Sequence, residues 1–171
     1  MNGITHLETF IHEPESLYHC LMHSVDWDER MATRKTVSYG QAYNYSQMTY
    51  PYRPFLPELQ ALLAPLKAVT GFEPNNCLVN YYPDGHAKMG YHSDRTDNLE
   101  NGTGIAIISL GTIRTLRFRN MADPTMFMNY DLKPGSLIYM TQEIQHAWQH
   151  AIPKTDTKEG RISLTFRSMI S

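Results

Sequence analysis

The sequence is poor in cysteine. Only Cys20 and Cys77 occur among its 171 residues, and they do not form a Cys-x-x-Cys pair. Small domains that depend on disulfides carry several closely spaced cysteines, so a disulfide framework is excluded. Two isolated thiols are typical of a reducing compartment, and we therefore expect a cytoplasmic protein.

The sequence also lacks an excess of charge and a long hydrophobic run. It has 15 lysines and arginines against 17 aspartates and glutamates, a net charge of -2. Without a global basic field, any nucleic-acid site must be a local patch. No apolar stretch approaches the roughly 18 residues that span a bilayer, and the start "MNGITHLETF" lacks the pattern of a signal peptide. We expect a soluble, unprocessed protein with no membrane partner.

The chain has the length and hydrophobic content of one domain. Hydrophobic residues make up 42%, enough to bury a core without a disulfide. Apolar residues recur at helical spacing over 14–25, which starts at Pro14, and over 57–70, which Gly71 follows. From residue 77 onward, short β-rich runs such as "CLVNYY" and "HAWQHAI" alternate with turn formers such as "PDG" and "KPGS". This order predicts a mainly β, α+β fold, a sandwich or jelly roll with two supporting helices.

One segment suggests a metal site. In a strand, His92 and Asp94 project to the same face and can bind one ion. The segment "QHAWQHAIP" offers His146 and His150 as a third ligand, and periodicity does not choose between them. Two histidines and one carboxylate with open positions are typical of non-haem Fe(II) oxygenases. The alternative is an ordinary surface strand end.

A second segment suggests an anion site. In "RISLTFR", Arg161 and Arg167 are six residues apart, so a strand places both on the same face as Ser163 and Thr165. Guanidinium groups bind carboxylates in a bidentate manner, which favours a dicarboxylate ligand. Beside an iron site, 2-oxoglutarate is the natural dicarboxylate. An exposed strand with alternating polarity is the alternative.

These motifs occur together in one known family. The sequence resembles the AlkB family of Fe(II)/2-oxoglutarate dioxygenases through "NYYPDGHAKMGYHSD", "ISLG", "LRFRN", "WQHAIP" and "RISLTFR", in the family's order. The upstream segment "TRKTVSYGQAYNYS" is similar to the nucleotide-recognition lid of the homologues that repair duplex DNA. The resemblance implies a double-stranded β-helix (jelly roll) in a single domain, 1–171. Residues 1–75 would form the helices and the lid, and residues 76–171 the catalytic core.

The resemblance also implies the cofactors and their ligands. These are Fe(II), the cosubstrate 2-oxoglutarate and O2. The third iron ligand is the histidine before the "xIP" motif, so the implied metal ligands are His92, Asp94 and His150. Residues implied to contact 2-oxoglutarate are Asn80, Tyr82, Arg161, Ser163, Thr165 and Arg167.

The residues implied to bind substrate match the family pattern less closely. It comprises Arg34, Tyr39, Tyr43, Tyr45 and Thr96, with Tyr45 placed to stack on a flipped base. DNA-repair members carry an acidic residue at the position of Thr96, and the lid proline of the family is Thr33 here. Plain aromatic packing of a flap is the alternative role for the three tyrosines.

The resemblance implies oxidative dealkylation of N-alkylated bases in DNA or RNA, which releases an aldehyde, succinate and carbon dioxide. An AlkB-like dioxygenase acting on a small molecule, a free nucleotide or a protein is the alternative. A non-catalytic jelly-roll module that keeps a metal for stability is a third reading. We expect alkylated nucleic acid as the partner, with a small-molecule substrate as the other possibility, and a monomeric chain.

Overall fold

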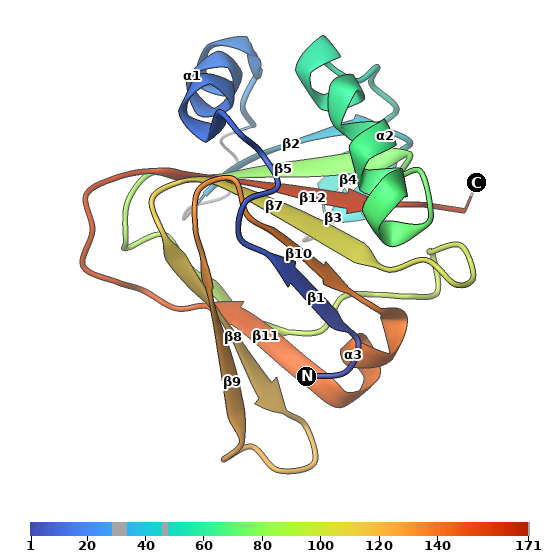
Figure 1. The fold of residues 1–171 in the computed structure, drawn as a ribbon, viewed down its shortest axis with the longest axis vertical. Coiled ribbons are helices and arrows are strands. Elements are labelled where there is room, and N and C mark those ends of the chain that lie inside the picture. Colours follow the sequence, from blue (N-terminus) through green and yellow to red (C-terminus); the bar gives the residue numbers. More distant parts are fainter. Residues whose placement is uncertain (29–33, 46–47, 171) are drawn as a thin grey trace.

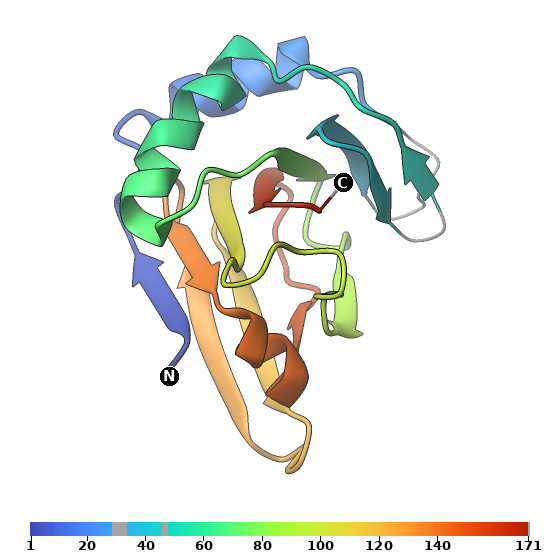
Figure 2. The ribbon, with the colours of Figure 1, turned by 90° about the vertical axis from the view of Figure 1, so that its right-hand side faces the viewer.

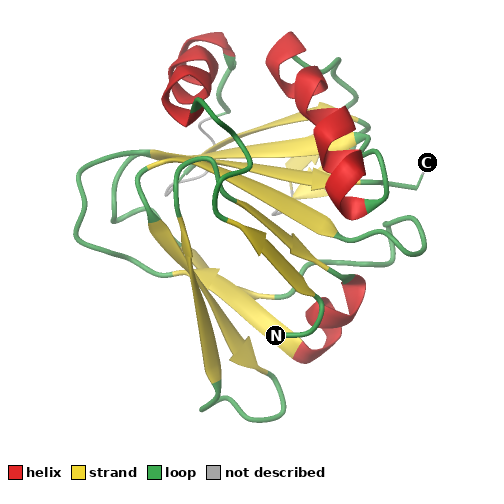
Figure 3. Ribbon diagram, viewed as in Figure 1, coloured by secondary structure: helices red, strands yellow, loops and turns green. Residues whose placement is uncertain are grey.

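The protein is built mainly of strands (Figure 1, Figure 3). The computed structural model describes residues 1–28, 34–45 and 48–170. Its helices are α1 (Pro14–Ser24), α2 (Pro57–Thr70) and α3 (Gln142–Ala147). Its strands are β1 (Ile4–Leu7), β2 (Lys35–Gly40), β3 (Tyr43–Tyr45), β4 (Met48–Tyr50), β5 (Asn76–Tyr82), β6 (Met89–His92), β7 (Ile105–Gly111), β8 (Arg114–Asn120), β9 (Phe127–Leu132), β10 (Leu137–Met140), β11 (Trp148–Ile152) and β12 (Arg161–Arg167).

The two long helices follow the sequence pattern closely. Both begin with a proline, whose missing N–H costs nothing in the first turn of a helix. The α2 helix ends at Thr70 and is capped by Gly71, which has a φ of 86° in the left-handed region that glycine adopts without strain. The helices predicted over 14–25 and 57–70 are therefore confirmed.

Two antiparallel sheets form the jelly roll. The larger has the order β1-β10-β7-β12-β5-β2, and the smaller has the order β6-β11-β8-β9. Both edge strands of the larger sheet, β1 and β2, come from the first 75 residues. The segment before residue 76 therefore supplies part of the jelly roll as well as helices and a hairpin, β3–β4, that lies to one side of the sheets (Figure 2).

The hydrophobic core has two layers, because the larger sheet is buried on both faces. One layer lies between this sheet and the helices α1 and α2, which cover its outer face (Figure 1). The other lies between the two sheets. Along β12, Ile162, Leu164 and Phe166 belong to the helix-side layer, so the alternate residues point between the sheets.

One strand begins later in the structure than the sequence predicts. The run "HAWQHAI" was expected to be extended from His146, but α3 includes His146 and β11 begins only at Trp148. The segment "QEIQHA" is rich in residues that favour a helix, and burial of Ile144 and Gln145 fixes that turn. Among the described residues, none of the helices has the length and apolar content required to cross a membrane.

The α2 helix provides a test of the helix-side core. Leu66 is fully buried, whereas Val69 on the same helix is 40% exposed. Leu66→Ala should lower the free energy of unfolding by about 2–5 kcal/mol, because it removes buried methyl groups and leaves a cavity. Val69→Ala should change it by less than about 1 kcal/mol. Urea denaturation measures both, and equal effects would contradict the described packing.

Candidate active site

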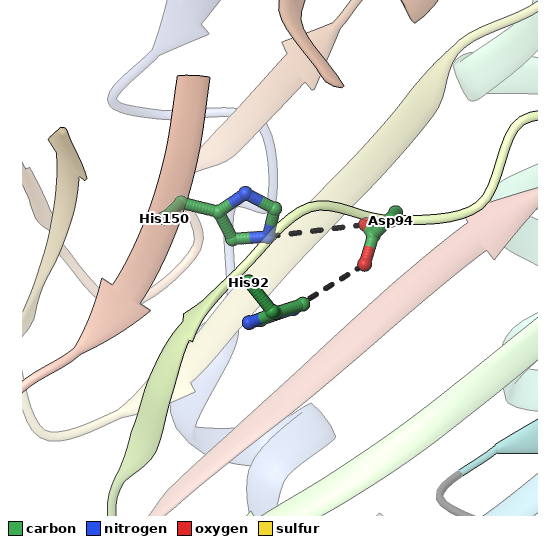
Figure 4. A group of neighbouring side chains, drawn as sticks. All are labelled: His92, Asp94 and His150. Carbon is green, nitrogen blue, oxygen red and sulfur yellow. Dashed lines mark ion pairs between the residues drawn. The ribbon is translucent and has the colours of Figure 1, made fainter. Parts of the chain in front are cut away.

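Two histidines lie side by side on neighbouring strands of the smaller sheet. Antiparallel pairing of β11 with β6 sets His150 directly opposite His92, and the ring centroids are 4.4 Å apart. Asp94 follows β6 and points into the same space (Figure 4). One potential ligand atom from each of the three side chains lies within 4.8 Å of the other two. This spacing suits a single metal ion.

The Asp94 carboxylate is the centre of this cluster. Its Oδ1 lies 3.3 Å from His92 Nε2, and its Oδ2 lies 3.9 Å from His150 Nε2. The Arg167 guanidinium approaches Oδ2 through Nη2 at 3.4 Å. The carboxylate therefore lies among two imidazoles and a cation.

Strand alternation alone does not position Asp94, because β6 ends at His92. The Oε1 atom of the buried Gln145 accepts a hydrogen bond from the Asp94 N–H at 2.8 Å. The Ser93 hydroxyl donates to the Trp148 carbonyl at 2.9 Å. These two bonds fasten the segment after β6 to the α3–β11 junction and aim the carboxylate inward.

Two of the three side chains, His150 and Asp94, are held in the protonation state that metal binding requires. Burial lowers the pKa of His150 to about 4, so this imidazole is neutral at pH 7. Burial opposes ionisation of Asp94, but Arg167 and the histidines outweigh it and hold its pKa below the usual range. Burial lowers the pKa of His92, but the hydrogen bond to Asp94 and the negative charge of that carboxylate outweigh burial and raise the pKa.

The orientation of His92 is set from behind. Its Nδ1 lies 2.8 Å from the Gly90 carbonyl, which accepts a hydrogen bond from the Nδ1–H tautomer. With the Nδ1–H held in this way, Nε2 faces Asp94 and can bind a metal once it gives up the proton that it shares with the carboxylate. Metal-binding histidines are commonly held by such a bond. By contrast, His146 is exposed on α3, where its Nε2 lies 3.2 Å from the Thr96 hydroxyl.

Behind the cluster lies a cavity between the sheets. The four polar residues of β12 predicted to share one face do so, and all of them line this cavity. Asn80 and Tyr82 of β5 line it as well, together with the three clustered side chains. The polar residues of β12 are Arg161, Ser163, Thr165 and Arg167.

Arg161 is the unusual member of the cavity wall. It is 1% exposed, its Nη2 donates to the Ser109 hydroxyl at 2.9 Å, and its guanidinium carbon lies 5.1 Å from the centroid of the Tyr82 ring. Its Nε and Nη1 make no hydrogen bond to the described part of the chain. Burial lowers its pKa, but an arginine remains charged. A buried cation with unused donors fits an anionic ligand.

Of the residues expected to bind substrate, some lie beside the cavity and others do not. The Tyr43 ring on β3 lies 4.8 Å from the guanidinium carbon of Arg167, and so borders the cluster. Arg34 is buried against the cavity wall, where its Nη1 donates to the Lys88 carbonyl at 2.8 Å and its Nε approaches Asn80 Oδ1 at 3.4 Å.

Tyr39 is not brought to the cavity, so its expected substrate contact needs correction. Strand alternation along β2 turns it with Val37 into the helix-side core, where it is 3% exposed and the Arg53 guanidinium carbon lies 5.6 Å from its ring centroid. Aromatic packing, the alternative role, describes its place. The side chain of Tyr45 and the residue Thr33 lie outside the described residues.

Two buried polar residues near the cavity were not recognised from sequence. Gln145 gave no signal, because a lone glutamine in a polar segment is common. Arg114 is 2% exposed and donates from Nη2 to the carbonyls of Ala87 and Pro153, both at 2.8 Å. It shares its strand face with the inward residues Leu116 and Phe118, and an arginine at such a position is a signal that sequence analysis could have used.

Comparison with known proteins agrees with this architecture. Residues 6–167 match the family model of the 2OG-Fe(II) oxygenase superfamily. The chain belongs to this superfamily. The family uses Fe(II), 2-oxoglutarate and O2, and the His-Asp-His cluster and the buried arginine are the donor sets that such groups require.

The resemblance to AlkB proteins is also confirmed. The rat protein named alpha-ketoglutarate-dependent dioxygenase alkB homolog 3 is 31% identical over 169 residues, which cover 87% of this chain and 57% of the relative. The human DNA oxidative demethylase ALKBH2 is 30% identical over 148 residues, 80% of this chain and 57% of the relative. The chain thus spans somewhat more than half the length of these relatives.

A solved structure, that of OsALKBH1, shares the fold. It superposes with a TM-score of 0.73 at 16% identity, covering 98% of this chain and 99% of that one. The jelly roll predicted from sequence is therefore confirmed.

Gln145 offers a test of how the cluster is held. Gln145→Leu keeps the volume but removes the acceptor for the Asp94 N–H, and an unpaired buried donor costs about 1–3 kcal/mol. Loss of an outer partner of a ligand should also weaken Fe(II) binding about 10- to 100-fold. Anaerobic calorimetry with Fe(II) measures this affinity.

The matched control is Gln142→Leu, also on α3. Gln142 donates to the carbonyls of Glu100 and Thr103, away from Asp94. Its loss should leave the Fe(II) affinity unchanged. Equal affinities for the two variants would show that Gln145 does not position the carboxylate.

Proposed function

We propose that the protein is an Fe(II)/2-oxoglutarate-dependent dioxygenase that dealkylates N-alkylated bases in DNA or RNA. Bound iron, 2-oxoglutarate and O2 supply the oxidation of an N-alkyl carbon, and the products are an aldehyde, succinate and carbon dioxide. The names of the relatives alkB homolog 3 and DNA oxidative demethylase ALKBH2 support this chemistry.

One observation carries the proposal. The three-residue cluster and the buried guanidinium of Arg161 line the same cavity, one offering metal ligands and the other unused cationic donors. A structural metal site needs no neighbouring anion pocket. A cavity with both features matches an enzyme that holds a metal and a dicarboxylate side by side.

The proposed roles follow from position. His92, Asp94 and His150 hold the iron. Arg161 binds the distal carboxylate of 2-oxoglutarate, and the other polar residues of the wall orient the rest of the molecule. These wall residues are Asn80, Tyr82, Ser163, Thr165 and Arg167.

Substrate approaches beside the β3–β4 hairpin in this proposal. Tyr43 and Arg34 border that side of the cavity, and His92 is exposed through 31% of its side chain. A base in a duplex has to be flipped out to reach such a site, and Tyr45 remains our candidate for stacking on it.

Thr96 favours a second candidate, a dioxygenase acting on a small molecule, a free nucleotide or a protein. Its hydroxyl hydrogen-bonds to His146, so a hydroxyl stands where DNA-repair members of the family place a carboxylate toward the base. A hydroxyl does not accept from an exocyclic amine as strongly as a carboxylate does. Because Cys20 and Cys77 are both free, we keep a cytoplasmic location as part of the proposal.

The deciding experiment measures formaldehyde release with Fe(II), ascorbate and 2-oxoglutarate. The panel contains methylated single-stranded and double-stranded oligonucleotides and the matching free nucleosides. We expect release from oligonucleotides in excess of that from nucleosides. Succinate formation without formaldehyde from any member would reject dealkylation of bases and favour the second candidate.

The choice between His150 and His146 gives a direct test of the iron site. His150→Ala should abolish Fe(II) binding and turnover, because two protein ligands form too weak a chelate. His146→Ala should retain Fe(II) binding, since its side chain lies outside the cluster. Calorimetry and succinate formation measure both variants, and the reverse result would mean that the third ligand is misassigned.

Arg161 tests the cosubstrate pocket. Arg161→Ala should raise the apparent Kd for 2-oxoglutarate about 30-fold or more, since truncating one member of a buried charge pair costs about 2–5 kcal/mol. The apparent Kd of Arg161→Lys should lie between those of the wild type and Arg161→Ala, because lysine keeps the charge but lacks the planar guanidinium. Succinate formation against 2-oxoglutarate concentration measures the effect. An unchanged affinity in Arg161→Ala would remove this residue from the pocket.

A further inference from the structure

The outer face of the smaller sheet carries an ordered row of aromatic and cationic side chains. Pairing of β11 with β8 sets Gln149 opposite Arg119, and pairing of β8 with β9 sets Arg119 opposite Phe127. The Arg119 guanidinium carbon lies 3.8 Å from the centroid of the Tyr91 ring on β6. Its Nη2 donates to Gln149 Oε1 at 2.8 Å, which fixes the guanidinium over the ring.

A second guanidinium is held beside this row. Arg117 Nε donates to Asn129 Oδ1 at 3.0 Å, and its guanidinium carbon lies 5.7 Å from the centroid of the Phe127 ring. Phe127 is 46% exposed. We call Tyr91, Arg117, Arg119 and Phe127 the sheet platform.

The charge on this face is mainly positive near the platform. Asp131 lies two residues beyond Asn129 on the same face, and its carboxylate accepts a hydrogen bond from the Thr115 hydroxyl. At the other end, in the turn after β8, Asp123 accepts from the Thr125 hydroxyl. Neither acidic group pairs with Arg117 or Arg119 in the described structure, so both guanidinium groups keep their full charge for a ligand.

The platform is continuous with the mouth of the cavity. Tyr91 immediately precedes His92, whose side chain is 31% exposed. Because side chains alternate along β6, the imidazole points inward and the phenol outward from adjacent residues. A chain that presents one unit to the cavity therefore has its neighbouring units within reach of Tyr91 and Arg119.

We propose that the sheet platform binds the single strand that flanks the target base. This inference rests on the proposed function, because it assumes a nucleic-acid substrate. Arginines bind phosphates and stack on bases, while exposed aromatic rings stack on bases of any sequence. Stacking needs unpaired bases, whereas a duplex offers the platform only its phosphates. The platform thus favours single-stranded over double-stranded nucleic acid.

The test measures binding rather than turnover. A fluorescein-labelled, unmethylated single strand of about 15 nucleotides is titrated with the full chain at several salt concentrations, with fluorescence anisotropy as the readout. Arg119→Ala should weaken binding and reduce the slope of log K against log salt by about 0.7, the value for one phosphate contact on a single strand. Phe127→Ala should weaken binding about 5-fold or more without changing the slope.

Two further variants serve as controls. One tests whether the aromatic ring of Phe127 is required, and the other tests whether loss of any positive charge weakens binding. Phe127→Leu keeps an apolar side chain but removes the ring, and should resemble Phe127→Ala. Lys133→Ala removes one positive charge at the end of β9, where Lys133 pairs with Glu8 at 3.2 Å. It should leave both affinity and slope within experimental error. Circular dichroism and thermal unfolding check that each variant is folded.

Three results would overturn the inference. They are no binding of the single strand by the wild-type chain, equal effects of Lys133→Ala and Arg119→Ala, or tighter binding of the matching duplex. A protein partner for this face would give the first result. Because the probe is unmethylated and no turnover occurs, failure of the inference is distinguishable from failure of dealkylation, which the formaldehyde assay reports separately.

Discussion

The alternation of side chains along β12 is the constraint on which the structure depends. This strand is central in the larger sheet, so each of its faces is buried. Its apolar residues complete the core beneath the helices, and its polar residues, with an arginine at each end, point between the sheets. Two guanidinium groups are thereby fixed in the interior. Their desolvation is tolerated only where anions or hydrogen-bond acceptors face them.

The two arginines meet that requirement differently. Arg167 approaches the Asp94 carboxylate and lies near the Tyr43 ring, so its charge is compensated within the protein. Arg161 has the Ser109 hydroxyl and the face of Tyr82, with two donor atoms unused by the described residues. One end of the strand therefore keeps the Asp94 carboxylate ionised, and the other end retains unused donors that suit an anion. In the proposed function, one rigid element thus couples the positions of the metal and the cosubstrate.

Much of this was predictable because it depends on periodicity. Helical spacing located α1 and α2, with Pro14 as a start signal for the first and Gly71 as a stop signal for the second. The even spacing of Arg161 and Arg167 placed them on one face. The pairing of His92 with Asp94 was predicted for a related reason, although the carboxylate lies just past the end of its strand. It is held there by the hydrogen bond that the Asp94 N–H donates to Gln145 and by the one that the Ser93 hydroxyl donates to the Trp148 carbonyl. Such tertiary contacts leave no periodic trace in the sequence.

The substrate side was less predictable, because aromatic residues serve both cores and binding sites. Tyr39 and Tyr43 lie four residues apart in the same tyrosine-rich segment. The first is in the helix-side core, and the second borders the metal cluster. A change of strand between β2 and β3 separates them, and the end of a strand is among the features that local sequence specifies least well. Only the three-dimensional structure therefore distinguishes a packing tyrosine from one at the site.

Strand alternation also connects the two faces of the smaller sheet. His92 and His150 point inward, while Tyr91 and Gln149, the residues just before them, point outward. A slip of one residue in the pairing of β6 with β11 would move a histidine to the surface and a platform residue into the cavity. The register of β6 against β11 is thus fixed from both sides, by the cluster of His92, Asp94 and His150 within and by the stacked Arg119 outside. For this reason the outer face belongs to the architecture of the site: whatever binds there contacts the same strands that carry the two clustered histidines.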